Sequence, residues 1–101
     1  MPVSNPKTKT YEYDLANHLR SKKEMAAYLD AWLSEAPDDV SGITRALGDI
    51  ARASGMSQIA RETGLNRESL YKALHENGNP SFATVLKVAH ALGLKLQARP
   101  A

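Results

Sequence analysis

The sequence contains no cysteine, only one phenylalanine and one tryptophan, and no long apolar run. Without cysteine the chain has no disulfide, no thiol nucleophile and no cysteine-ligated zinc site, which fits a reducing cytosol, so we expect a cytoplasmic protein. No segment approaches the roughly 20 apolar residues that cross a bilayer, and the first residues lack the apolar core of a signal peptide. Aromatic residues make up 6% of the chain, whereas alanine and leucine are frequent. This composition favours a helical bundle over a β-sandwich.

Groupings of residues that support catalysis are also scarce. The histidines His18, His75 and His90 lie in separate segments without the spacing of metal ligands, and Asp38 and Asp39 are adjacent, so they point to different sides of a helix. No glycine-rich phosphate loop is present. We therefore expect no enzymatic activity, no metal ion and no cofactor.

The charge is distributed unevenly along the chain. The formal net charge is +2, which by itself does not indicate a nucleic-acid partner. Residues 1–50 carry six Lys/Arg against eight Asp/Glu, a net charge of −2, and residues 51–101 carry seven against three, a net charge of +4. Phosphate binding needs local positive charge of this kind, so the second half of the chain is the better candidate.

Apolar spacing predicts five helices, and the first of them is strongly amphipathic. Ser21 and Glu24 form a capping-box pattern, with a hydroxyl and a carboxylate three residues apart. Behind it apolar residues recur at i, i+3, i+4, i+7 and i+8, which predicts an amphipathic helix: Met25, Tyr28, Leu29, Trp32 and Leu33. Pro37 ends this helix, and together with Asp38 and Asp39 it suits the first turn of the next one.

The second helix is predicted to end at Gly55. Its expected buried stripe consists of Val40, Ile43, Leu47, Ile50 and Ala51. Gly42 and Gly48 lower the helix propensity by about 1 kcal/mol each relative to alanine. Since glycine has no side chain, we expect both residues to permit close approach of another helix.

Three shorter helices complete the predicted bundle, two of them over residues 57–63 and 67–75. Ser81 caps the last helix and Gly93 ends it; its expected apolar face consists of Phe82, Val85, Leu86, Ala89 and Leu92. Residues 94–97 alternate between apolar and polar, which fits a short terminal strand.

The chain divides into three parts within one domain. We expect residues 1–10 to be a disordered lead-in, residues 11–36 to hold an N-terminal segment and the amphipathic helix, and residues 37–97 to form the helix-turn-helix unit described below. Residues 11–15 alternate between apolar and polar. They fit either a short strand or the approach to a helical turn that ends near Arg20.

A tight bend is predicted between the two short helices. Ala60 is small where the helices cross, Gly64 ends the first helix at a positive φ, and Leu65 anchors the corner. Asn66 can cap the second helix. The residues expected to point inward are Ile59, Leu65, Leu70, Ala73 and Leu74. This pattern predicts a helix-turn-helix, whose second helix is offered to the major groove of DNA; the alternative is an ordinary helical hairpin with a glycine cap.

The outward side of the second helix has side chains that suit DNA. Arg67 can make a bidentate contact with O6 and N7 of guanine. Tyr71 and Lys72 follow one turn further along the groove, and Ser69 points toward phosphate. Glu68 either accepts from N4 of cytosine or pairs with Lys72 within the helix. Tyr71 is either a groove contact or a half-buried packing residue.

These residues resemble a known class of regulators. Residues 44–96 resemble the Cro/repressor-like, XRE-type helix-turn-helix domains, so the expected fold is an all-α, five-helix bundle of the lambda-repressor-like type. Further short motifs, which extend over about residues 10–97, look like the family of probable addiction module antidote proteins: ALGDIARA at 46–53, GMSQIA at 55–60, SLYKAL at 69–74, GNP at 78–80 and ALGLKL at 91–96.

The resemblance implies a HigA-like antitoxin of a toxin–antitoxin module. Its partner would be a RelE/HigB-like toxin, a small basic nuclease that cuts mRNA on the ribosome. The antitoxin would bind operator DNA as a homodimer and repress its own operon. The family pattern maps DNA contact onto Ser57, Gln58, Asn66, Arg67, Glu68, Tyr71 and Lys72.

The surfaces that bind the toxin and the second protomer are not set by a motif. One hypothesis is that the stripe from Met25 to Leu33 lies in a groove of the toxin; the alternative is that it completes the core. The dimer could form by pairing of residues 94–97 as strands or by packing of the last helix. Two rival functions are a solitary XRE-type regulator and a protein-interaction module without DNA affinity.

Overall fold

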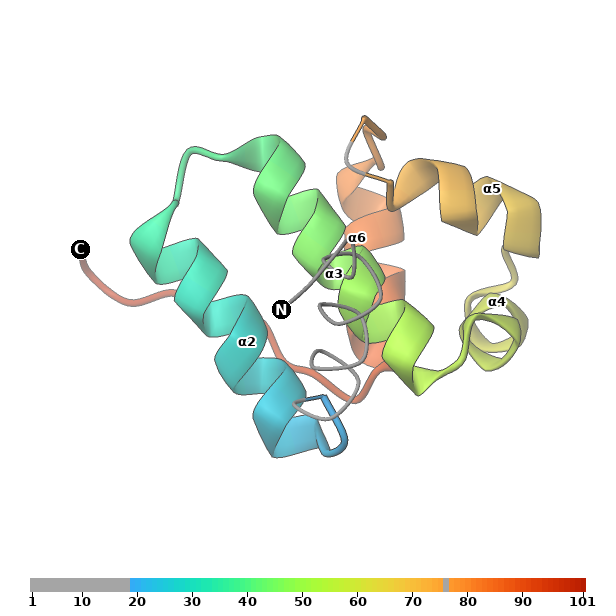
Figure 1. The fold of residues 1–101 in the computed structure, drawn as a ribbon, viewed down its shortest axis with the longest axis horizontal. Helices are drawn as coiled ribbons and strands as arrows, with labels where there is room; N and C mark the ends of the chain where they lie inside the picture. The colour runs from blue at the N-terminus through green and yellow to red at the C-terminus, as the bar shows by residue number, and fades with distance from the viewer. Residues whose placement is uncertain (1–18, 76) are drawn as a thin grey trace, which may run out of the picture.

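The computed structural model describes residues 19–75 and 77–101 (Figure 1). Within these residues the chain forms five helices: α2 (Lys22–Glu35), α3 (Val40–Ser54), α4 (Met56–Thr63), α5 (Arg67–Ala73) and α6 (Phe82–Ala91). The described part contains no strand, so the expected strand at residues 94–97 is absent there. The expectations for residues 1–10 and 11–15 lie outside the described residues.

α3 lies in the middle of the view in Figure 1, with α2 on one side and α4 and α5 on the other. α2 packs on α3, and α4 packs on α3, α5 and α6. The largest fully buried side chains come from each of the last four helical segments: Ile50, Ile59, Leu70, Leu74 and Val88.

Two residues predicted to be buried are exposed. Val40 is 66% exposed and Phe82 is 71% exposed, and each is the first residue of its helix. The apolar spacing continues one turn beyond the core at each of these helix starts, because the first turn of a helix can extend beyond the element on which the helix packs. The predictions for these two side chains were therefore wrong.

The start of α3 also differs from the prediction. Asp39 is the N-cap, since its Oδ1 accepts a hydrogen bond from the N–H of Gly42 at 2.9 Å. The N–H of Asp39 in turn donates to the carbonyl oxygen of Ala36 at 3.0 Å. Residues 37–39 thus form a turn before α3 rather than its first turn.

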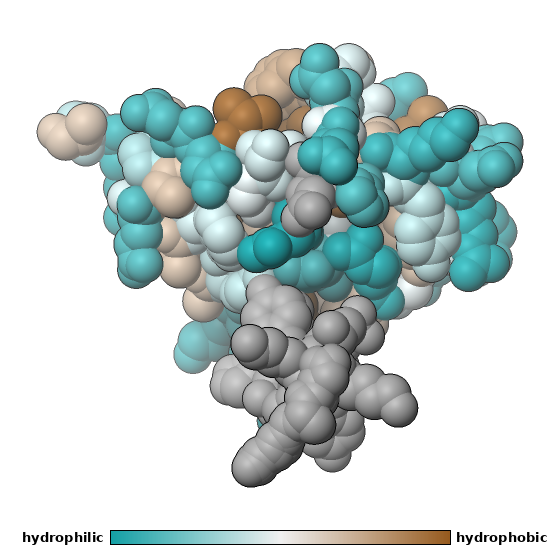
Figure 2. Space-filling view, turned by 45° about the horizontal axis from the view of Figure 1, so that its top comes forward, coloured by the Kyte–Doolittle hydropathy of each residue, from teal (hydrophilic) through white to brown (hydrophobic). Residues whose placement is uncertain are grey.

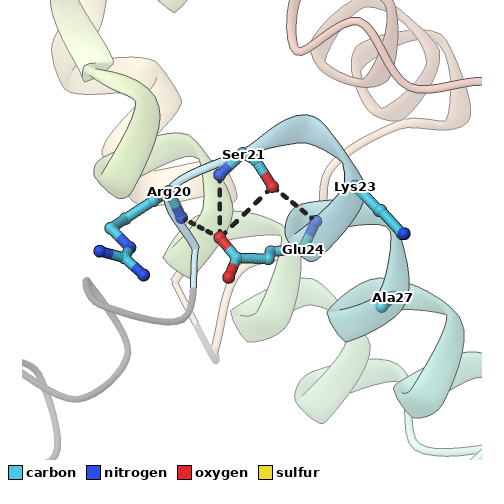
Figure 3. Close-up of a pocket in the computed structure, with 5 residues that line it drawn as sticks. All are labelled: Arg20, Ser21, Lys23, Glu24 and Ala27. Carbon is cyan, nitrogen blue, oxygen red and sulfur yellow. Dashed lines mark hydrogen bonds between the residues drawn. The ribbon is translucent and has the colours of Figure 1, made fainter.

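The capping box at the start of α2 is confirmed. Ser21 Oγ accepts from the N–H of Glu24 at 3.1 Å, and Glu24 Oε1 accepts from the N–H groups of Arg20 and Ser21 at 3.0 and 3.1 Å (Figure 3). Two side chains therefore satisfy three backbone donors at this helix start.

Gly42 and Gly48 both lie at close contacts, as predicted. A Cβ on Gly42 would collide with the ring of Trp32 on α2, and a Cβ on Gly48 would collide with the carbonyl oxygen of Leu74 at the end of α5. The two glycines thus permit α3 to approach helices on both of its sides.

We predict that Gly48→Ala lowers the free energy of unfolding by about 1–2 kcal/mol. Overpacking costs about 1–3 kcal/mol, whereas the gain in helix propensity is about 1 kcal/mol at most. The collision prevails because it involves the main chain of Leu74, which cannot rotate away. Urea unfolding measures the change. Ser41→Ala, on an exposed position of the same helix, serves as the control, and an unchanged or higher midpoint for Gly48→Ala would contradict the argument.

Candidate nucleic-acid interface

α4 and α5 are joined by the three-residue turn 64–66, as the sequence predicts. Gly64 has a φ of 76°, in the left-handed region, and its N–H donates to the carbonyl oxygen of Ala60 at 3.0 Å. Asn66 Oδ1 accepts from the N–H of Ser69 at 2.9 Å and so caps α5. The glycine and the asparagine end one helix and begin the next within three residues.

Apolar side chains hold this corner against the core. Ala60 and Leu70 are buried, and Leu65 is half-buried against the same cluster. Leu74, which follows α5 as its C-cap, is fully buried. Because α5 is only seven residues long, its stability depends on this packing and on the Asn66 cap rather than on its own helix propensity.

The opposite side of α5 faces outward. Arg67, Glu68, Ser69, Tyr71 and Lys72 are all exposed. Hydrophilic side chains, with paler ones between them, are numerous on the right-hand side of the molecule in Figure 2, the side on which α5 lies in Figure 1. The helix therefore presents a polar ridge with two cations, as the spacing predicts.

Arg67 and Tyr71 contact each other on this ridge. The guanidinium carbon of Arg67 lies 5.6 Å from the centre of the Tyr71 ring, within the range of a cation–π interaction. Tyr71 is 39% exposed, so it is partly covered, and Arg67 is one of the residues that contact its ring. In the described residues no ion pair joins Glu68 to Lys72, which leaves the Glu68 carboxylate directed to solvent.

Ser57 and Gln58 are exposed in the first turn of α4. Gly55, the N-cap of α4, has no side chain, and no side-chain hydrogen bond caps this helix start. Gln58 Nε2 donates to Glu62 Oε2 at 3.1 Å. The first N–H groups of α4 are thus left without a capping side chain.

The apolar stripe of α2 is largely turned toward α3. Met25 and Leu29 are buried in the core, and Tyr28 Oη donates to Asp49 Oδ2 of α3 at 2.9 Å. Trp32 is half-buried and lies 5.6 Å from the guanidinium of Arg45. In contrast, Leu33 is 43% exposed. The sequence reasoning missed the pairing of Tyr28 with Asp49, because the two residues lie on different helices and share no local pattern.

The described residues lack the features of a metal site and of a membrane-spanning helix. These residues contain no group of three or more histidines, cysteines or acidic residues that could hold a metal ion. Of the helices described, none has the length and apolar character needed to cross a membrane. Asp39 caps α3, and His18 lies outside the described residues.

The described residues thus define an all-helical protein in which two short helices meet at a tight turn. The chain belongs to the family described as probable addiction module antidote protein, whose model matches residues 9–100. It is also 55% identical, over 86 residues, to a Haemophilus influenzae protein named "Uncharacterized protein", a match that covers 85% of this chain and 87% of that protein. No solved structure matches the chain. Family membership indicates an antitoxin role and, in general, a toxin partner.

We predict that Asn66→Ala lowers the free energy of unfolding by about 1 kcal/mol, because the N–H of Ser69 loses its acceptor. Asn66→Asp keeps a carboxylate oxygen at the same position, so its stability should match that of the unchanged chain. Thermal or urea unfolding of the two variants measures the difference. Equal stability of the alanine and aspartate variants would show that the cap contributes nothing.

Proposed function

We propose that this protein is the antitoxin of a type II toxin–antitoxin module. It binds operator DNA as a homodimer through an XRE-type helix-turn-helix, represses its own operon and neutralises a RelE/HigB-like toxin. The observation that carries the DNA-binding part is the exposed polar ridge of α5, set at a tight turn against α4. The antidote family supports the toxin partner.

In this proposal α5 makes the contacts that recognise bases. Arg67 lies in the first turn of α5 and carries five donors in a planar fork that matches O6 and N7 of guanine. The ring of Tyr71 beside it restrains the guanidinium on the exposed side. Restraint of this kind reduces the conformational entropy that Arg67 would lose on binding a base.

Phosphate contacts fall to the start of α4 and to Lys72. The first N–H groups of α4, which include those of Ser57 and Gln58, lack a capping side chain, and a helix N-terminus attracts anions. Lys72 in the last turn of α5 adds a cation. Contacts to phosphate position the protein on the duplex, and they make its affinity depend on salt.

A homodimer would place two α5 helices about 34 Å apart, one turn of DNA, over a near-palindrome. Two exposed apolar side chains mark the segments that could pair. Phe82, at the start of α6, is 71% exposed, and Leu96, in the segment after α6, is 40% exposed. Burial of either one between protomers would remove apolar surface from water and stabilise the dimer.

We predict that Arg67→Ala reduces discrimination at one base pair of each half-site by about 1–3 kcal/mol. Arg67→Lys keeps the charge but loses the bidentate geometry, so it should also lose discrimination while it keeps the salt dependence. Gel shifts on the upstream promoter and on single-base variants of it measure both. Unchanged operator preference for Arg67→Ala would exclude a role in base recognition.

We predict that Lys72→Ala weakens binding to all DNA sequences about equally and reduces the slope of log K against log salt by about 1 per protomer. A salt series with specific and random duplexes measures the slope. Lys95→Ala, which removes an exposed cation after α6, is the control. Equal effects of the two substitutions would mean that Lys72 contributes only through net charge.

A further inference from the structure

One end of the molecule is acidic and carries exposed apolar side chains. Residues 25–44 contain four acidic residues and no lysine, arginine or histidine. They form most of α2, the turn after it and the first residues of α3. We call the exposed part of this end the acidic corner: Asp30, Leu33, Glu35, Asp38 and Val40.

The acidic corner is open to solvent. Val40 is 66% exposed and Leu33 is 43% exposed. Glu35 and Asp38, which lie between them in the sequence, are also exposed. Asp30 lies 3.7 Å from Arg99, but both side chains are more than half exposed, so this ion pair contributes little. The α2 to α3 turn lies on the opposite side of α3 from α4 and α5 (Figure 1).

A shallow groove adjoins the acidic corner. It has a volume of about 250 Å³ and runs between α2 and the segment that follows α6. Leu33 lines it from α2 and Leu96 from the segment, and the charged residues Asp30, Lys95 and Arg99 line it as well. The apolar surface at this end is thus continuous from Leu33 into the groove.

The position of Glu35 strengthens the negative potential of the acidic corner. Glu35 is the last residue of α2, and the last turn of α2 has no basic side chain. The C-terminal end of a helix carries a partial negative charge, so an acidic residue there destabilises the helix. A cation brought by a partner would be attracted by the carboxylate and by the helix end together.

Charge decides which partner fits this end. The acidic residues Asp30, Glu35, Asp38 and Asp39 outnumber the cations Arg45, over Trp32, and Arg99, beside Asp30, so the net charge here would repel DNA and anionic membranes. A second copy of this chain related by a two-fold axis through this patch would place the patch against itself, with like charges opposed. A nuclease that binds RNA needs a cationic surface. We propose that the acidic corner docks the toxin of the module through cationic side chains around an apolar contact with Leu33 and Val40, an inference that rests on the proposed function.

The test uses single charge reversals in the full chain. The probe is the protein encoded by the reading frame adjacent to the gene for this chain, purified by co-expression and then separated. Glu35→Lys and Asp38→Lys should each weaken its binding at least tenfold in calorimetric titration, with a larger effect at low salt. Glu62→Lys on α4 makes the same change in net charge at an exposed position remote from the acidic corner and should bind as the unchanged chain does.

Loss of folding does not account for the expected result, because Glu35→Lys places a cation at the C-terminal end of α2, where it stabilises the helix. The double substitution Leu33→Ser and Val40→Ser should reduce the affinity for the probe by the same factor at low and at high salt. Normal binding by both charge reversals, or equal weakening by Glu62→Lys, would overturn this inference alone. Failure of the unchanged chain to bind the probe would overturn it together with the proposed toxin partner.

Discussion

The rest of the structure depends on how closely α4 and α5 approach at their shared turn. Ala60 keeps the crossing narrow, Gly64 supplies a left-handed φ of 76°, and Leu65 closes the corner against the core. The buried side chains of Leu70 and Leu74 attach α5 to the core, and Gly48 of α3 leaves room for the backbone of Leu74. A helix of seven residues is held in one orientation by its neighbours, so the direction of its outward side is determined by the core.

Much of the fold could be predicted because its signals are local. A hydroxyl three residues before a carboxylate predicts the cap at Ser21, and asparagine before a short apolar pattern predicts the cap at Asn66; both are confirmed. The exposed side of α5 follows from the same periodicity that predicts Leu70 inside. These features need only the geometry of one helix turn, so a single sequence is enough to find them.

The predictions that failed depend on distant parts of the chain. Periodicity shows which side of α3 and α6 is apolar, but it does not show where the core ends, so Val40 and Phe82 were placed inside although they are exposed. The alternation at residues 94–97 would give a strand only with a neighbouring strand, and the described residues contain none. The contact between Tyr28 and Asp49 arises from the packing of α2 on α3, which no local pattern specifies.

The distribution of exposed groups suggests how the two proposed interactions coexist. α5, which carries Arg67 and Lys72, lies on one side of α3 in Figure 1, and α2 and the turn after it, which carry Glu35 and Asp38, lie on the other side. A phosphate backbone would be attracted by Arg67 and Lys72 on α5 and repelled by Glu35 and Asp38 in the acidic corner. This distribution of charge would favour the orientation of the protein in which α5 faces the DNA. A cationic partner would instead be attracted by the acidic corner and repelled by α5. The proposed toxin contact at the acidic corner and the proposed DNA contact at α5 use different residues, so occupancy of the acidic corner would leave α5 open.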